Sequence, residues 1–122
     1  MGPGPRDAFV HELSIAQSIL DTIVDQAQEH RAGRVTAIRL RVGELTAIVE
    51  DALTFSFEIL AQDTCAAGAL VSVETIPWQV RCPDCTHEYR VVDGMPTCPR
   101  CHRVGGETIT GRELQIVEMD VE

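Results

Sequence analysis

Two pairs of cysteines constrain the fold of this 122-residue chain more than any other feature. Cys82-Pro-Asp-Cys85 and Cys98-Pro-Arg-Cys101 each place two residues between their cysteines, so one tight turn can direct both thiolates toward the same ion. The proline after the first cysteine supplies the fixed backbone angle that such a turn needs. Two turns of this kind make a tetrahedral site of four sulfurs, which selects zinc, or iron in a rubredoxin-like site, over hard cations.

A closed site of four thiolates leaves no coordination position for water or substrate, so we expect its zinc to be structural. The segment around the cysteines has few apolar residues with which to build a core. Zinc binding contributes on the order of 10 to 16 kcal/mol and can order such a segment instead. We therefore predict a zinc-binding domain at residues 79–106.

Two histidines flank the cysteine pairs, and the sequence leaves two roles open for them. His87 lies two residues after Cys85, and His102 directly follows Cys101. Both can be surface groups that hydrogen-bond around the cage. Alternatively, each can be a ligand that replaces a thiolate as pH or metal load changes.

The rest of the chain predicts an α+β fold. Apolar residues recur at helical spacing over residues 13–30, and a second helix begins near Glu50 and Asp51. Alternating patterns at residues 35–42, at residues 70–76 and in the last ten residues predict strands. We expect a small mixed sheet backed by two helices, with a zinc-ribbon-like four-cysteine domain inserted before the last strand.

The first nine residues, MGPGPRDAF, contain two prolines and two glycines and have no periodicity. We therefore expect residues 1–9 to form a disordered extension. The main domain is then predicted to comprise residues 10–78 and 107–122, on either side of the zinc-binding domain.

Charge and composition exclude several classes of function. A formal net charge of -9 argues against binding nucleic acid, because phosphate recognition depends on lysine and arginine. No apolar stretch approaches the roughly 18 to 20 residues that span a bilayer, and the first residues lack a secretory pattern, so we expect a cytoplasmic protein without a membrane partner.

In the cytoplasm the cysteine pairs would stay reduced, which favours a metal site over disulfides. We expect no enzyme, because Cys65 has no neighbouring base and no phosphate-binding glycine loop occurs.

Several motifs, in this order along the chain, resemble the HypA/HybF family of hydrogenase maturation proteins. They extend over most of the chain, from about Val10 to Glu122, and their combination is much more specific than any one of them. They are His11-Glu12-Leu13-Ser14-Ile15-Ala16, Arg41-Val42-Gly43-Glu44-Leu45, residues 52–60, the two cysteine pairs and Gly111-Arg112-Glu113-Leu114.

The resemblance implies a nickel metallochaperone that delivers Ni(II) to the large subunit of a [NiFe]-hydrogenase. His11 matches the family's nickel-binding histidine, which spacing alone would not identify, and Glu12 matches the adjacent residue whose amide and side chain are implicated around the metal. Imidazole and amide nitrogens provide the nitrogen-rich field that suits Ni(II). The matched zinc ligands are Cys82, Cys85, Cys98 and Cys101, and His87 and His102 match histidines that flank the cage. The implied partners are a nickel GTPase of the HypB type and, for some relatives, urease accessory proteins.

The chain departs from the family pattern at its beginning. In the family the nickel histidine normally follows the initiator methionine, so that the free amino group can join the ligands. Here nine residues and Val10 precede His11. We hypothesise that Val10 is decoded as an alternative start, in which case residues 1–9 would not be made.

Two other functions are compatible with the cysteine pairs. One is a zinc-ribbon adaptor that binds a partner protein and carries no nickel. The other is a rubredoxin-like redox protein with iron in the cage, which would absorb visible light when oxidised.

Overall fold

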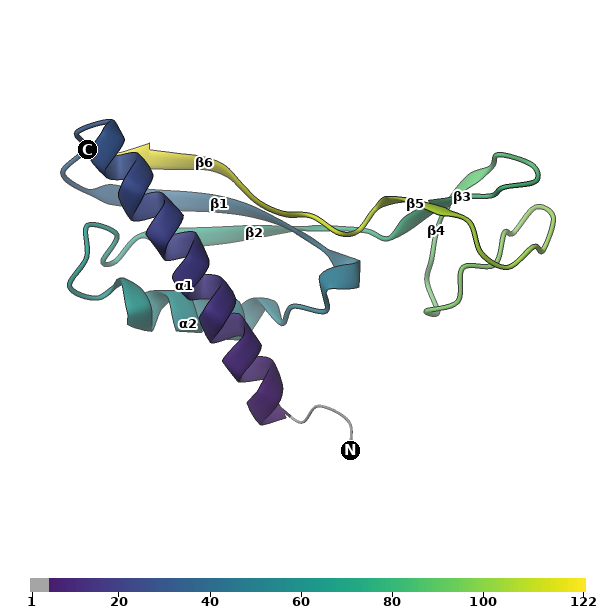
Figure 1. The fold of residues 1–122 in the computed structure, drawn as a ribbon, viewed down its shortest axis with the longest axis horizontal. Helices are drawn as coiled ribbons and strands as arrows, with labels where there is room; N and C mark the ends of the chain where they lie inside the picture. Colours follow the sequence, from purple (N-terminus) through teal and green to yellow (C-terminus); the bar gives the residue numbers. More distant parts are fainter. Residues whose placement is uncertain (1–4) are drawn as a thin grey trace. The chain divides into compact units, whose positions relative to one another are not determined.

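The computed structural model describes residues 5–122, with side chains from His11 onward. Its α-helices and strands, labelled in Figure 1, are α1 (Pro5–Glu29), β1 (Val35–Gly43), α2 (Glu50–Ala61), β2 (Leu70–Ile76), β3 (Gln79–Arg81), β4 (Glu88–Arg90), β5 (Glu107–Thr110) and β6 (Leu114–Val121). A short 3-10 helix, η1 (Glu44–Thr46), follows β1. Internal contacts divide the chain into two compact units. The first unit comprises Met1–Leu40, Ile48–Glu74 and Ile116–Glu122, and the second comprises Arg41–Ala47 and Thr75–Gln115.

The first unit is built around two helices that pack against each other. The buried apolar side chains of α1 recur at helical spacing, which places them along one stripe of the helix. They are Ala16, Ile19, Leu20, Ile23 and Ala27. In α2, Leu53 and Phe57 occupy positions four residues apart and are almost fully buried. The helical periodicity of the sequence therefore marks the face of each helix that forms the core.

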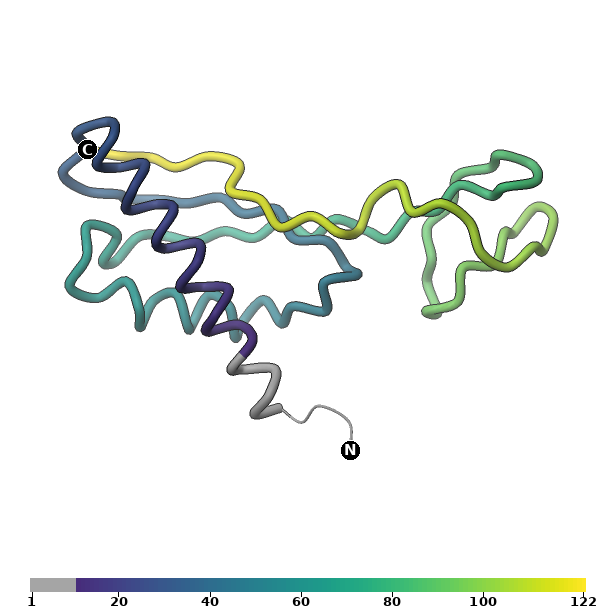
Figure 2. The backbone as a smooth tube through the Cα atoms, viewed as in Figure 1, coloured from purple at the N-terminus to yellow at the C-terminus, as the bar shows by residue number. Residues whose placement is uncertain are grey.

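β1 is the central strand of a three-stranded sheet with the order β2-β1-β6. Its residues Ile38 and Leu40 are buried, whereas Arg39 between them is exposed, as expected for a strand with one covered face. The chain runs along β1 and β2 in the same direction and along β6 in the opposite one (Figure 1), and α2 makes the crossover that parallel strands require. Figure 2 shows the C-terminal segment returning beside β1. The predicted mixed sheet with two helices is thus confirmed.

The first helix begins earlier than predicted, at Pro5. A proline fits the first turn of a helix because its missing N–H would have no intrahelical acceptor there. The structure places residues 5–9 in this helix, and residues 1–4 lie outside the described part of the chain, so the extension predicted for residues 1–9 stays a prediction. His11 and Glu12, expected just before the helix, lie within it.

The second unit contains a small antiparallel sheet with the order β4-β3-β5. Val80 in β3 pairs with Tyr89 in β4 and with Thr108 in β5. A compact core joins these strands and includes two of the predicted metal ligands; it consists of Val80, Cys82, Tyr89, Val91 and Cys98, with Trp78 and Cys85 packed against it. The borders of this unit lie outside residues 79–106, so the functional division that we predicted stays a prediction.

Candidate metal centre

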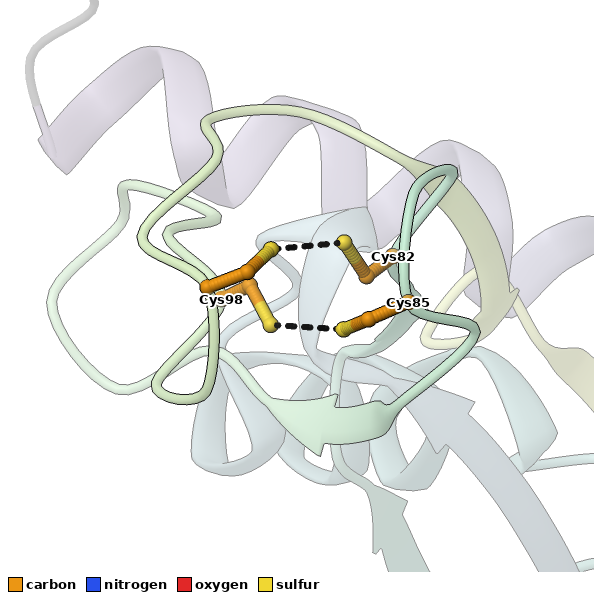
Figure 3. Close-up of side chains that lie close together, drawn as sticks. Cys82, Cys85 and Cys98 are labelled. Atoms are coloured by element: carbon orange, nitrogen blue, oxygen red, sulfur yellow. Dashed lines mark hydrogen bonds between the residues drawn. The ribbon is translucent and has the colours of Figure 1, made fainter.

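The four paired cysteines come together in the second unit. One sulfur from each lies within 4.8 Å of all the others, and the described residues contain no other such group of three or more histidine, cysteine or acidic side chains. Cys82 Sγ lies 3.4 Å from Cys101 Sγ, and Cys85 Sγ lies 3.6 Å from Cys98 Sγ (Figure 3). A tetrahedral zinc with bonds of about 2.3 Å separates its sulfurs by about 3.8 Å. The donor set and its spacing therefore fit a tetrahedral zinc ion.

Two turns of the same construction hold these sulfurs. In the first, the N–H of Cys82 donates to the carbonyl of His87 and the N–H of Thr86 donates to the carbonyl of Cys82, at 2.9 and 3.0 Å. In the second, the N–H of Cys98 donates to the carbonyl of Arg103 and the N–H of His102 donates to the carbonyl of Cys98, at 2.9 and 2.8 Å. Each bond has its counterpart 16 residues later. The repeated motif in the sequence thus folds into a repeated turn.

Both turns end in a left-handed residue, although neither has a glycine there. Thr86 has φ 60° and His102 has φ 66°. This conformation is unusual for a β-branched residue such as threonine. The turns adopt it in spite of this cost, because the backbone must reverse there for its N–H groups to reach the sulfurs.

Backbone N–H groups favour the thiolate form of the first cysteine in each turn. The N–H of Cys85, assisted by that of Asp84, lowers the pKa of Cys82 to about 7 although burial opposes the shift. Burial also opposes ionisation of Cys98, but the N–H groups of Cys101 and Arg100 outweigh it and lower its pKa. These cysteines are predisposed to bind a cation.

The second cysteine of each turn behaves in the opposite way. The N–H of His87 favours the Cys85 thiolate, but burial and the thiols of Cys98 and Cys82 together raise its pKa. For Cys101, the favourable N–H of Arg103 is outweighed by Cys82 and by burial, which raise the pKa to about 12. Four thiolates this close together repel one another, and a divalent cation removes that conflict.

The histidines beside the cage occupy different environments. His87 is partly buried, and its ring lies nearly parallel to that of Tyr89, with the centroids 6.3 Å apart and the planes at 15°. His102 is exposed at the end of the second turn. Neither imidazole belongs to the group of four sulfurs. Their roles around the cage, or as exchanging ligands, stay predictions.

The structure does not bring the side chains of His11 and Glu12 together. Neighbouring residues of a helix project about 100° apart, and here His11 is exposed whereas Glu12 is only 2% exposed. Glu12 Oε1 accepts a hydrogen bond of 3.2 Å from the N–H of Val49, the residue that precedes α2. Its other oxygen is buried without a hydrogen-bond partner among the described residues. The carboxylate of Glu12 therefore connects the two helices of the first unit.

Glu44 has a structural role that the sequence did not reveal. Its Oε1 accepts hydrogen bonds from the N–H of Trp78, at 3.0 Å, and from the Arg90 guanidinium, at 3.1 Å. These two hydrogen bonds connect η1 to Trp78, which precedes β3, and to Arg90 in β4. In the sequence, Trp78 and Arg90 lie on either side of the first cysteine turn. Two donors, one of them a charged side chain, explain why a carboxylate stands at this position.

Replacing Glu44 by alanine is expected to destabilise the second unit by roughly 1 to 2 kcal/mol, because one backbone N–H and one guanidinium lose a charged acceptor. The only tryptophan, Trp78, lies at the site of the change, so its fluorescence during urea unfolding measures the effect. Glu107→Ala is the matched control: Glu107 pairs with Arg81 at 3.7 Å on the surface, and we expect little change. Equal effects of the two substitutions would contradict this role.

Comparisons with known proteins agree with the motifs and the fold. The family model described as "Hydrogenase/urease nickel incorporation, metallochaperone, hypA" matches residues 10–121. A hydrogenase maturation factor HypA of Chloroflexus aurantiacus is 43% identical, covering 91% of this chain and 98% of that protein. One of Dehalococcoides mccartyi is 40% identical, with coverages of 93% and 95%, and the hydrogenase maturation factor HybF of Salmonella typhimurium is 35% identical, with coverages of 93% and 100%.

Solved structures show the same fold at low sequence identity. The solution structure of the nickel metallochaperone HypA from Helicobacter pylori has a TM-score of 0.64 at 18% identity, covering 90% of this chain and 96% of that one. A second solution structure of a HypA protein has a TM-score of 0.69 at 18% identity, with coverages of 93% and 97%. Within the described residues, no helix has the length and apolar character to cross a membrane. From the family match and these relatives, the chain belongs to the HypA family of nickel-incorporation metallochaperones that act in hydrogenase maturation.

Proposed function

We propose that this protein binds Ni(II) through His11 and the backbone around Glu12 and delivers it to the large subunit of a [NiFe]-hydrogenase, while the four cysteines hold a structural zinc ion. The main support is the family match, which begins at the residue before His11. The two proposed sites also offer different donor atoms, which is consistent with this proposal. The four cysteine sulfurs suit zinc, and the imidazole nitrogen of His11 suits nickel.

The structure favours the amide of Glu12 over its carboxylate as a nickel ligand. The carboxylate is buried and accepts the N–H of Val49, so it cannot turn toward the exposed imidazole of His11 without losing that bond. Amide nitrogens, however, bind Ni(II) only when they are not donating within a helix. In a helix that begins at Pro5, residues 11 and 12 lie beyond the first four N–H groups, which alone lack an intrahelical acceptor. Nickel binding should therefore unwind the beginning of α1.

The same reasoning applies to residues 1–9, which we proposed to be absent from the translated protein. A chain that starts at Val10 would place the amides of His11 and Glu12 among the first four N–H groups of the helix, where they are free to coordinate. Its free amino group would also lie next to His11. We expect nickel to bind such a chain more tightly than the chain with residues 1–9.

The partners follow from the resemblance to the HypA/HybF family, which implies a nickel GTPase of the HypB type. The sequence contains no phosphate-binding glycine loop, which is consistent with GTP hydrolysis taking place in that second protein. We propose a non-catalytic, cytoplasmic protein that cooperates with this GTPase and serves a hydrogenase, or urease accessory proteins in cells that make urease.

Replacing His11 by alanine is expected to weaken nickel binding at least tenfold, because the imidazole is the only side-chain nitrogen proposed for the site. Calorimetric titration of the zinc-loaded protein measures this, and the unchanged protein should bind in the micromolar class, roughly -8 kcal/mol. His30→Ala is the control, since His30 is also exposed and lies just beyond the other end of α1.

Two further results bear on the proposal. Glu12→Gln keeps an oxygen that can accept the N–H of Val49, so nickel affinity should change little if the amide is the ligand. If nickel binds equally well after His11→Ala, the protein carries no cargo at this site, and a zinc-containing adaptor is the better description.

A further inference from the structure

The negative charge of this protein is concentrated in one of its two units. The first unit contains 13 acidic residues and four arginines, whereas the second contains six of each. The chain has no lysine. The whole formal charge of -9 therefore belongs to the first unit. A partner of that unit would gain electrostatic attraction by being basic.

A groove with a volume of about 420 Å³ lies between α1 and β6 in this unit. On the helix side it is lined by Thr22, Gln26 and His30. On the strand side the lining is mainly apolar and includes Val117, Met119 and Val121. Val117 and Val121 are exposed to solvent, so the groove presents apolar surface that nothing in the described part of the chain covers.

β6 is an edge strand of its sheet, and its outer backbone groups face away from β1. Both backbone groups of Glu122 bond toward β1: its N–H donates to the carbonyl of Arg34, and its carbonyl accepts from the N–H of Gly33. The carbonyl of Asp120 accepts from the hydroxyl of Thr36. Since backbone groups alternate in direction along an antiparallel strand, those of residues 117, 119 and 121 point to the open edge. Such an edge can accept another strand.

Carboxylates surround this edge and groove. On β6, Asp120 and Glu122 alternate with the apolar residues, and on α1, Asp25 and Glu29 immediately precede two residues that line the groove. No ion-pair partner for these four is found among the described residues, whereas Glu118 pairs with Arg39 at 2.8 Å. A second copy of the chain would place its own acidic strand here and be repelled.

We propose that the open edge of β6 and the adjoining groove bind an extended segment of a basic partner protein, in which arginine or lysine alternates with apolar residues. Main-chain hydrogen bonds to residues 117, 119 and 121 add the segment to the sheet. Its apolar side chains enter the groove beside α1, and its basic side chains face the carboxylates. This binding requires no nickel and stands independently of the metal proposals.

The test uses a capped peptide of alternating arginine and valine, added to the full-length, zinc-loaded protein labelled with ¹⁵N. We expect chemical-shift changes confined to residues 116–122 and to the part of α1 that lines the groove. Hydrogen exchange should slow at the amides of residues 117, 119 and 121, with little further protection at the residues between them, which already bond to β1. An alternating glutamate and valine peptide should bind at least tenfold more weakly.

Met119→Pro removes an outward N–H without removing a bond to β1, so it should weaken peptide binding at least tenfold while Met119→Leu does not. The exchange pattern of the unchanged protein gives an independent answer if the proline variant does not fold. Two outcomes would overturn the proposal. One is equal binding by a peptide with its arginines and valines in separate blocks, which indicates charge attraction alone. The other is a stable dimer through β6 in the absence of peptide.

Discussion

Replacing Cys98 by serine is expected to abolish stable zinc binding and to unfold the second unit while the first unit keeps its helices. Cys98 is fully buried, belongs to the core of the second unit and supplies a sulfur to the four-cysteine group. A structural zinc site contributes on the order of 10 to 16 kcal/mol, which is comparable to the whole stability of a small domain. Removal of one thiolate therefore costs both the ion and part of the core.

The measurement is the zinc content of the purified variant together with Trp78 fluorescence and an ¹⁵N spectrum. We expect less than one zinc per chain, a red-shifted tryptophan emission because Trp78 packs against this core, and loss of dispersed signals from residues 75–115. Cys65→Ser is the control, since Cys65 lies in the first unit and outside the sulfur group. A variant that retains zinc and the native fluorescence would refute the structural role of the cage.

Replacing Gly43 by alanine is expected to destabilise the protein by about 3 kcal/mol, the upper end of the usual range for overpacking. A Cβ atom on Gly43 would lie 2.0 Å from the carbonyl oxygen of Gly111. This oxygen belongs to the backbone and accepts the N–H of Leu45, so it cannot move aside without losing a bond. Gly43 has φ -81° and ψ 148°, which any residue can adopt. The clash alone requires glycine.

Thermal unfolding measures this effect, and the midpoint should fall by roughly 10 °C. Gly33→Ala is the matched control, because a Cβ atom there would have no neighbour within 4 Å. The control should leave the midpoint nearly unchanged. Equal unfolding midpoints for the two variants would show that the backbone at Gly43 can move away from the backbone at Gly111 at little cost, contrary to this prediction.

Much of the metal centre could be predicted from the sequence because its geometry is local. Two residues between cysteines, with a proline after the first, define a turn whatever surrounds it. Two copies of the turn in one chain predict one tetrahedral site, and the structure brings all four sulfurs together. The apolar periodicity of α1 and the alternation in β1 are likewise local, and both mark buried faces correctly.

Other features depended on contacts between distant residues. Glu12 and Val49 are 37 positions apart, and Glu44 and Arg90 are 46 apart, so no spacing rule relates them. The sequence showed a glutamate beside His11 and a glutamate in a turn. Only the folded chain shows that Glu12 connects the two helices of the first unit. It also shows that Glu44 forms hydrogen bonds on both sides of the first cysteine turn. The start of α1 was also missed, because prolines and glycines near residues 1–5 suggested disorder although proline is tolerated in a first helical turn.

The sequence by itself therefore determined which four cysteines come together in one group, because turn geometry depends only on neighbouring residues. It also determined which faces of the helices and strands are apolar. Only the tertiary structure decided which polar side chains are buried in hydrogen bonds within the fold and which remain exposed at the surface. A carboxylate can be buried where hydrogen-bond donors pack against it, because a buried charge without such partners is costly. Those donors come from distant parts of the chain.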